Sequence, residues 1–530
     1  MKMAHLSTNQ TIGILTALLM VASAVGIAVK WIRVPYSVAL VIVGLVIGSM
    51  QLLPPVAMTP ELILLVCLPA LLFEASWNID LVELKRNWIP ISVFATLGVL
   101  ISMTICALVL CRMGGVDYRV ALLFGALISA TDPISVLASF RRLGVDKRLS
   151  LLIEGESLFN DGIAVVLFKI VLVIAITQVV PSPLGGVLTF LSNVLGGTLV
   201  GLVIGVAGSR VMKLFDDRLL EITLTAIVAY GSFLVAEQFD VSPVLAVLAA
   251  GIVFGNYGSR TAMSPATRLA VNSFWEYAAF VVNSLVFLLI GMQVHIQTLL
   301  SSAHLVGLGI LAILVARVVV VGGLTPFCSS RHLPISGKWQ AMLVWGALRG
   351  SLSMAIALST PLTFPMRDQL ITLTFGVVLF TLLVSGSTVE PLAHFLGLLL
   401  KNEKTRQFSL LQSKLIAENE AMESLQAMYK KGTVSQKNFE VLEKEIVNRQ
   451  DHLNHRIIDL HIENASIEEL QLTQARRHLL EVRKDSIMQL AREENLEPEV
   501  VEELMLGFDE KLESIEDRAE QVGRDLLQES

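Results

Sequence analysis

Charged residues are scarce in this chain. Asp, Glu, Lys and Arg make up only 16% of its 530 residues, whereas hydrophobic residues make up 54%. The mean hydropathy is +0.68, which is higher than ordinary soluble domains show. This composition excludes a soluble globular protein and indicates a chain that crosses a membrane several times.

Cysteine is also rare, and the four present, Cys67, Cys106, Cys111 and Cys328, lie in or beside apolar segments. Their spacing fits neither paired metal ligands nor a disulfide framework, so we expect packing residues. The absence of a Gly-x-x-x-x-Gly-Lys-Ser/Thr phosphate loop disfavours a primary pump. The sequence also lacks a nucleophile and base set or a metal-ligand cluster. We therefore expect neither an enzyme nor a cofactor, and no nucleic-acid partner.

Long apolar runs are abundant instead, and windows of about 20 residues predict about thirteen transmembrane helices. The predicted spans are 10–30, 35–53, 60–77, 88–111, 118–139, 149–177, 184–212, 219–237, 242–257, 271–293, 302–326, 338–360 and 367–398. The first span is long enough to cross and is followed directly by another, so it is expected to be retained rather than cleaved as a signal peptide. The predicted fold class is an all-α polytopic membrane protein with a soluble helical tail.

The distribution of Lys and Arg predicts the orientation. Loops after odd-numbered spans hold fifteen of them, whereas loops after even-numbered spans hold three. By the positive-inside rule the N-terminus is outside and the C-terminus is cytoplasmic. Residues 1–400 form the predicted transmembrane domain. Residues 401–530, with 18 Lys plus Arg against 28 Asp plus Glu, form a predicted cytoplasmic domain.

Apolar spacing in the tail predicts helices near 405–430, 436–463, 465–493 and 497–527. We expect them to form antiparallel hairpins or a coiled coil. Its acidic charge can simply be a solvated surface. A regulatory role, in which the tail senses pH or binds a cytoplasmic partner, is a hypothesis.

Two spans are interrupted by polar and helix-breaking residues, at 125–133 and at 346–353. Pro133 removes a backbone donor, so the helix should open near Thr131 and Asp132. Freed carbonyls, a hydroxyl and a carboxylate are hard oxygen ligands that suit an alkali cation, although a simple proline kink is the alternative. Because seven spans separate the two interruptions, they fit the broken helices of two inverted repeats.

The sixth span contains Glu154, Glu156, Asp161 and Lys169 within an apolar run. Facing lipid, these four charges would cost about 10–14 kcal/mol. This helix should therefore lie inside a bundle, with its polar groups paired, protonated or facing water. Lys169 and Arg317, a cation in the eleventh span, are both candidates for structural ion pairs with buried acids.

Helical spacing divides the polar residues of the sixth span between two faces. One face carries Glu154, Ser157 and Asp161, which could offer oxygens to an ion beside Asp132. The other carries Glu156 and Asn160, and Arg349 in the twelfth span is the predicted cation that holds this pair. Glu74, near the end of the third span, could be an ion ligand or an interfacial residue.

The sequence resembles the NhaP/NHE branch of the monovalent cation:proton antiporters, the sodium/proton antiporters. The resemblance covers about residues 10–400 and rests on Thr131-Asp132, the run Gly155-Glu156-Ser157-Leu158-Phe159-Asn160-Asp161-Gly162, Phe274-Trp275-Glu276 and Leu348-Arg349-Gly350. It implies thirteen helices, with a six-helix core that moves against a dimerisation domain, and exchange of Na⁺, sometimes Li⁺ or K⁺, for H⁺. A homodimer in the cell membrane that serves pH homeostasis is then expected.

The resemblance also implies roles for individual residues. Asp161 is the principal shared site for cation and proton. The residues that help to hold the ion are Asp132, Ser157, the backbone of Thr131 and Glu74. Glu156, Asn160 and Arg349 form a structural group beside the site.

One titrating group at the Asn160-Asp161 pair predicts one-for-one, electroneutral exchange, because electrogenic relatives have a second Asp in place of Asn160. If Asp132 also titrates, the stoichiometry changes. Two alternatives stay open. One is K⁺/H⁺ antiport by the same fold, and the other is a gated cation channel, which predicts currents rather than electroneutral flux.

Overall fold

The computed structural model describes residues 8–31, 35–51, 62–179, 182–214, 217–259, 263, 265–292, 296–329, 335–361, 363–398, 403–430, 432–463 and scattered positions between 472 and 511. It divides into two units, Met1–Leu399 and Leu400–Ser530. Helices are the regular elements of both units, and the described ranges contain no β-strand. The tail helices predicted near 465–493 and 497–527 lie largely outside the described residues.

Helices occupy every range in which the sequence predicts a membrane span. The helices are α1 (Thr8–Val29), α2 (Tyr36–Ser49), α3 (Leu68–Trp77), α4 (Leu81–Arg86), α5 (Trp88–Val93), α6 (Val99–Gly114), α7 (Tyr118–Ile128), α8 (Ile134–Leu143), α9 (Lys147–Thr177), α10 (Pro183–Met212), α11 (Arg218–Gln238), α12 (Pro243–Val253), α14 (Pro265–Met292), α15 (Ile296–Ser301), α16 (Ala303–Cys328), α17 (Gly337–Trp345), α18 (Ser351–Leu358), α19 (Arg367–Phe380) and α20 (Gly386–Leu396). Four π-helical turns interrupt or extend them: η1 (Leu62–Cys67), η2 (Phe94–Gly98), η3 (Phe254–Gly258) and η4 (Thr381–Ser385).

Seven helices in the described ranges are long and apolar enough to cross a membrane, and shorter apolar helices accompany them. The total of thirteen crossings remains a prediction. The most apolar 18-residue window of α9 is 56% buried inside the protein, whereas that of α10 is 11% buried. The sixth predicted span is thus an interior helix, as its buried charges require, and α10 presents most of its apolar surface outward.

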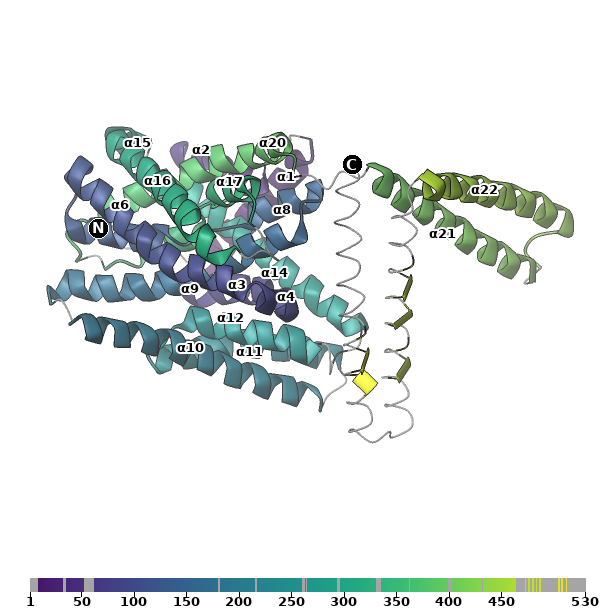
Figure 1. The fold of residues 1–530 in the computed structure, drawn as a ribbon, viewed down its shortest axis with the longest axis horizontal. Coiled ribbons are helices and arrows are strands. Elements are labelled where there is room, and N and C mark those ends of the chain that lie inside the picture. The colour runs from purple at the N-terminus through teal and green to yellow at the C-terminus, as the bar shows by residue number, and fades with distance from the viewer. Residues whose placement is uncertain are drawn as a thin grey trace. The chain divides into compact units, whose positions relative to one another are not determined.

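The first unit contains two groups of mutually packed helices. In one group α6 packs against α7 and α16, α7 packs against α9 and α19, and α20 packs against α8. In the other, α10, α11 and α12 pack together, α12 packs against α3, and α14 packs against α2 and α3. Figure 1 shows α10, α11 and α12 side by side along one edge of this unit. α9 contacts α3, α10 and α12, so it lies between the two groups.

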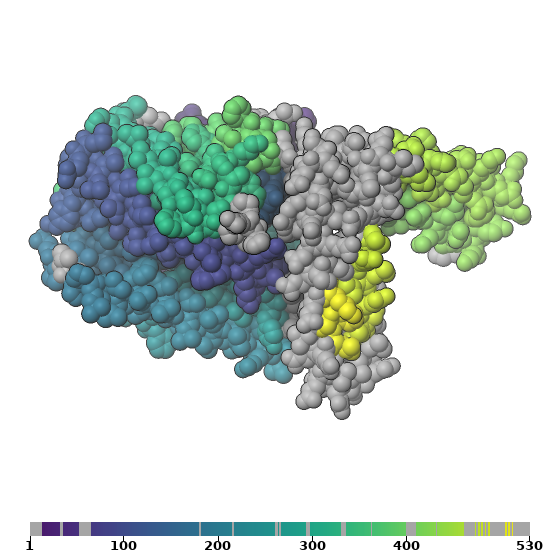
Figure 2. Space-filling view, in the orientation of Figure 1, coloured from purple at the N-terminus to yellow at the C-terminus, as the bar shows by residue number. Residues whose placement is uncertain are grey.

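Segments far apart in the sequence meet throughout this unit. In Figure 2 the blue surface of α6 adjoins the green surface of α16. Close approach also depends on glycine, because a Cβ on Gly201 in α10 would lie 2.1 Å from the carbonyl oxygen of Ala246 in α12. The bare backbone at Gly201 therefore allows α10 to pack directly on α12.

The second unit contains a helical hairpin made of α21 (Glu403–Lys430) and α22 (Gln436–Glu463). A small apolar cluster joins the two helices and consists of Leu411, Leu415, Leu453 and Ile457. Near the turn, the rings of Tyr429 and Phe439 lie 4.6 Å apart between centroids, and Gly432 has a positive φ of 71°. The first half of α21 packs against the second half of α22, and the end of α21 packs against the start of α22. The two helices therefore form the antiparallel hairpin predicted for 405–430 and 436–463.

Candidate functional site

Two interrupted helices meet at their breaks. The first break separates α7 from α8 and the second separates α17 from α18, as Pro133 and the run 346–350 predict. The backbone N–H of Asp132 donates to the carbonyl oxygen of Leu348 at 2.9 Å. The hydroxyl of Ser353 donates to the carbonyl oxygen of Leu127 at 3.0 Å. Each break therefore satisfies backbone groups that the other leaves without helical partners.

The interior helix α9 holds the first break in place through Thr131. The hydroxyl of Ser157 donates to the carbonyl oxygen of Thr131 at 2.6 Å. The amide Nδ2 of Asn160 donates to Oγ1 of Thr131 at 2.8 Å, and the backbone N–H of Thr131 donates to Oδ1 of Asn160 at 3.3 Å. All three residues are buried. Asn160 thus clamps the unwound segment with both ends of its amide.

Two carboxylates lie beside this clamp. Oδ1 of Asp161 is buried and has no hydrogen-bond partner among the described residues. Oδ1 of Asp132 accepts from the backbone N–H of Ile134, the first residue of α8, at 3.1 Å. The two carboxylates are close enough to interact electrostatically. A buried carboxylate oxygen without a donor is a position where a proton or a cation can bind.

Glycine at position 350 makes room for Asp132. A Cβ built on Gly350 would lie 2.2 Å from Oδ2 of Asp132. Any larger residue at 350 must therefore displace the carboxylate. The Leu348-Arg349-Gly350 motif thus places its backbone directly against the first break.

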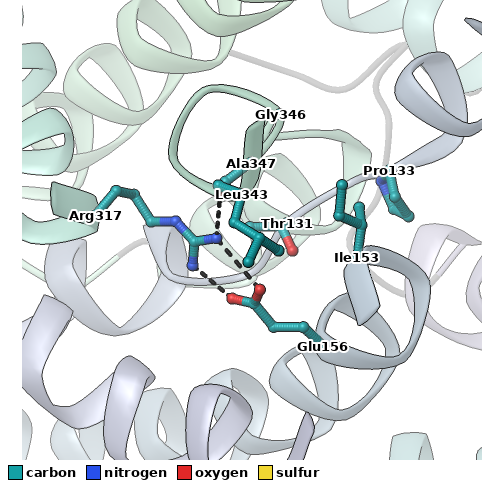
Figure 3. Close-up of a pocket in the computed structure, with 8 residues that line it drawn as sticks. All are labelled: Thr131, Pro133, Ile153, Glu156, Arg317, Leu343, Gly346 and Ala347. Carbon is teal, nitrogen blue, oxygen red and sulfur yellow. Dashed lines mark hydrogen bonds and ion pairs between the residues drawn. The ribbon is translucent and has the colours of Figure 1, made fainter. Parts of the chain in front are cut away.

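The prediction that Arg349 forms the ion pair with Glu156 is wrong. In Figure 3, Arg317 of α16 points at Glu156, with Nη1 to Oε1 at 2.5 Å and Nη2 to Oε2 at 3.3 Å. Nη2 of Arg317 also donates to the carbonyl oxygen of Leu343 at 2.8 Å. Both members of the pair are buried. The structural ion pair expected for Arg317 is confirmed, and it takes the place assigned to Arg349.

Arg349 makes different contacts. Its Nη1 donates to the carbonyl oxygen of Ala347 at 2.9 Å, so the side chain folds back on its own unwound segment. Its backbone N–H donates to Oγ1 of Thr381, in η4, at 3.1 Å. The guanidinium still interacts electrostatically with Asp161 and Glu156. Asn160 does not share a cation with Glu156 because its amide is occupied by Thr131.

A small cavity of about 10 Å³ lies between this ion pair and the two breaks. It is lined by Thr131, Pro133, Ile153, Glu156, Arg317, Leu343, Gly346 and Ala347 (Figure 3). Its size is that of a single water molecule. The Glu156–Arg317 pair therefore forms one wall beside the unwound segments.

Glu74 lies on α3, apart from the clamp. Its Oε1 accepts from Nδ2 of Asn78 at 3.1 Å, and within the described ranges no hydrogen bond joins it to the residues around Asp161. It interacts electrostatically with Glu154, Glu276 and Arg141. The structure thus places Glu74 in a separate charged group, on a helix that contacts α9.

Two further outcomes concern residues outside the clamp. Lys169 forms no hydrogen bond or ion pair with any residue that the structure describes, so the structural pair expected for it is not found. Thr381, which binds the second break, was not predicted, because a Thr in a long apolar run carries no distinguishing signal. Its position in a π-helical turn is visible only in three dimensions.

Comparison with known proteins identifies the family of this chain. The family model for the sodium/hydrogen exchanger, transmembrane, matches residues 14–395. The low-affinity Na⁺/H⁺ antiporter NhaS1 of Synechocystis sp. is 42% identical over 393 residues, which cover 73% of this chain and 74% of that protein. The Na⁺/H⁺ antiporter NhaG of Bacillus atrophaeus is 34% identical over 514 residues, which cover 94% and 97% respectively.

The fold also matches a solved structure. The sodium proton antiporter MjNhaP1 of Methanocaldococcus jannaschii, solved at pH 8, superimposes with a TM-score of 0.63 at 20% identity and covers 73% of this chain and 98% of that one. At this identity the likeness concerns the fold. The family match and the sequence identities confirm the resemblance identified from the motifs, and the chain belongs to the sodium/hydrogen exchanger family.

Proposed function

We propose that the chain exchanges Na⁺ or Li⁺ for H⁺, one for one, with Asp161 binding cation and proton in alternation. Membership of the family makes it a multi-pass membrane transporter and not an enzyme. The observation that carries the finer proposal is the buried Oδ1 of Asp161, which has no donor among the described residues. A single carboxylate can be neutralised by a proton or by a cation but not by both, so the two compete.

The neighbouring oxygens suit a small alkali cation. The carboxylate of Asp132, the carbonyl oxygen of Thr131 and the hydroxyl of Ser157 all lie at the same break. Oxygen ligands of this kind are preferred by hard cations. Glu74 helps to hold the ion from α3, a helix that contacts α9.

The proposal of electroneutral exchange depends on how many groups near the site can change charge. Asn160 does not titrate, and both ends of its amide bind Thr131. Glu156 is neutralised by Arg317. If Asp132 keeps its charge through the cycle, Asp161 carries the charge change alone, and the states loaded with H⁺ or with Na⁺ have the same net charge.

Obligatory coupling follows from the cost of an empty site. An unpaired carboxylate buried among helices is strongly disfavoured in a low-dielectric interior. The loaded states therefore interconvert between inward and outward access, whereas the empty state is held back. This inference makes Asp161 the group that prevents leakage of either ion.

The cellular setting is part of the proposal. A homodimer in the cell membrane, with the N-terminus outside and the tail in the cytoplasm, would serve pH homeostasis. The helical tail would act as a regulatory unit that senses pH or binds a cytoplasmic partner. Deleting residues 405–530 tests this role, and an unchanged pH profile and ion affinity would contradict it.

The exchange itself is tested with purified protein in sealed proteoliposomes. A pH dye reports proton movement when Na⁺, Li⁺ or K⁺ is added, with and without a permeant ion that clamps the voltage. We expect proton movement with Na⁺ or Li⁺ that is insensitive to voltage and absent in Asp161→Asn. A response to K⁺ alone would indicate a K⁺/H⁺ antiporter. Voltage-driven cation flux without proton movement would indicate a channel, and voltage-sensitive exchange would show that Asp132 or another group also titrates.

A further inference from the structure

A second cavity, far larger than the first, lies between α9 and α10, where α9 ends and α10 begins. Its volume is about 530 Å³, which is within the range of pockets that bind small molecules. It is lined by Val166, Lys169, Ile170, Val173, Ile174, Thr177, Val179, Gly186, Thr189 and Asn193. Most of these side chains are apolar, and Lys169 is the only charged one.

Lys169 is unusual among the cations of the transmembrane unit. It lies on α9 eight residues before the end at Thr177, about 12 Å along the helix axis. Its side chain is exposed, and it has no hydrogen-bond or ion-pair partner among the described residues. A cation inside an apolar segment is costly unless an anion or water meets it. Its flexible stem can carry the ammonium group toward the end of the helix, where the membrane interface lies.

We propose that this cavity binds an anionic phospholipid of the surrounding bilayer. One acyl chain occupies the apolar part lined by Val166 and Ile170, toward the middle of the membrane, and the phosphate group meets the ammonium of Lys169. The hydroxyl of Thr189 lies on the facing helix and offers a donor to the same headgroup. The combination of a single charged lining residue, a cation, with a mostly apolar cavity selects an amphiphile with a negative headgroup.

The position of the cavity gives the bound lipid a role in transport. α9 carries Asp161 and packs with α7, whereas α10 packs with α11 and α12 in the other group of helices. The lipid therefore lies between the helix that holds the ion site and the helices against which it would move. Because the cavity is outside the ion site, lipid binding can be measured independently of ion exchange.

Native mass spectrometry of the full-length protein in detergent tests the proposal, with phosphatidylglycerol and phosphatidylcholine of identical acyl chains as probes. We expect wild type to retain phosphatidylglycerol in preference to phosphatidylcholine by about fivefold, which one Lys beside an anionic headgroup supplies. Lys169→Gln should abolish this preference and leave weak, headgroup-independent binding. Thr189→Phe fills the cavity without changing charge, so it should reduce binding of both lipids.

Lys30→Gln is the matched control, because Lys30 is also exposed but lies at the end of α1, away from the cavity. This variant should bind both lipids as wild type does. Size-exclusion profiles identify any variant that fails to fold. An unchanged preference in Lys169→Gln, or an equal loss in Lys30→Gln, would overturn the assignment. In proteoliposomes, phosphatidylglycerol should alter the exchange rate of wild type and not that of Lys169→Gln.

Discussion

Arg317 of α16 holds Glu156 of α9 with both nitrogens of its guanidinium fork, at 2.5 and 3.3 Å, and reaches the carbonyl oxygen of Leu343 as well. The pair joins three helices beside the crossing of the broken segments. Its burial makes it sensitive to loss of either partner, because the remaining charge has no access to water.

We expect Arg317→Met to destabilise the protein by about 3–5 kcal/mol, since it leaves Glu156 as an unpaired buried charge. Thermal unfolding in detergent measures the effect. Arg142→Gln is the control, because Arg142 forms an exposed ion pair with Glu390 that contributes less than about 1 kcal/mol. Equal losses in the two variants would contradict the assigned role of Arg317.

Asp161→Asn should abolish exchange while leaving thermal stability close to that of wild type. The substitution keeps the shape of the side chain, and Oδ1 has no donor to lose among the described residues. Proteoliposome flux and an unfolding curve on the same preparation separate the two effects. Residual Na⁺-dependent proton movement would place the shared site on another residue.

Gly350→Ala should strongly reduce exchange, because the new Cβ would lie 2.2 Å from Oδ2 of Asp132 and must displace it. Gly307→Ala, on α16, is the matched control, since nothing lies within 4 Å of a Cβ there. In a helix interior that change is expected to stabilise by up to about 1 kcal/mol. If Gly350→Ala transported like Gly307→Ala, the carboxylate of Asp132 would not need its observed position.

Competition for one carboxylate sets the pH dependence of exchange. At pH values below the pKa of Asp161, protons occupy the site. The half-saturating Na⁺ concentration should therefore rise about tenfold for each unit by which the pH falls in this range. At high pH the return step lacks a proton and the maximal rate should fall. Na⁺ titrations in proteoliposomes at several pH values test this. A half-saturating concentration that stays constant across pH would exclude a shared site.

The sequence predicted those features that depend on neighbouring residues alone, such as a helix break or the polarity of a helix. Pro133 and the run 346–353 indicated the two breaks, and the charges of the sixth span indicated an interior helix. Helical spacing also assigned Glu156 to a structural pair. It could not identify the cation, because spacing gives the face of a helix but not which neighbour lies opposite. Arg317 and Arg349 were both possible ion-pair partners for Glu156. The packing of α16 against α17, which the structure shows, places Arg317 opposite Glu156.

Contacts between segments that are far apart in the sequence could not be predicted from helical spacing either. The bond between Asp132 and Leu348 joins two stretches whose backbones are irregular, and no periodicity predicts its register. The clamp that Asn160 places on Thr131 likewise required the structure. The motifs predicted which residues belong to the candidate site, whereas the hydrogen bonds of individual donors and acceptors followed from the geometry.

The mutual bonding of the two breaks restricts how the ion site can open. If one unwound segment shifted alone, the N–H of Asp132 and the carbonyl oxygen of the buried Leu348 would both lose their partner. The crossing therefore has to travel as a single piece, and its amide protons should stay protected from solvent throughout the cycle. Access to the ion would change at the boundary of that piece, where α9 meets α3, α10 and α12, rather than within it.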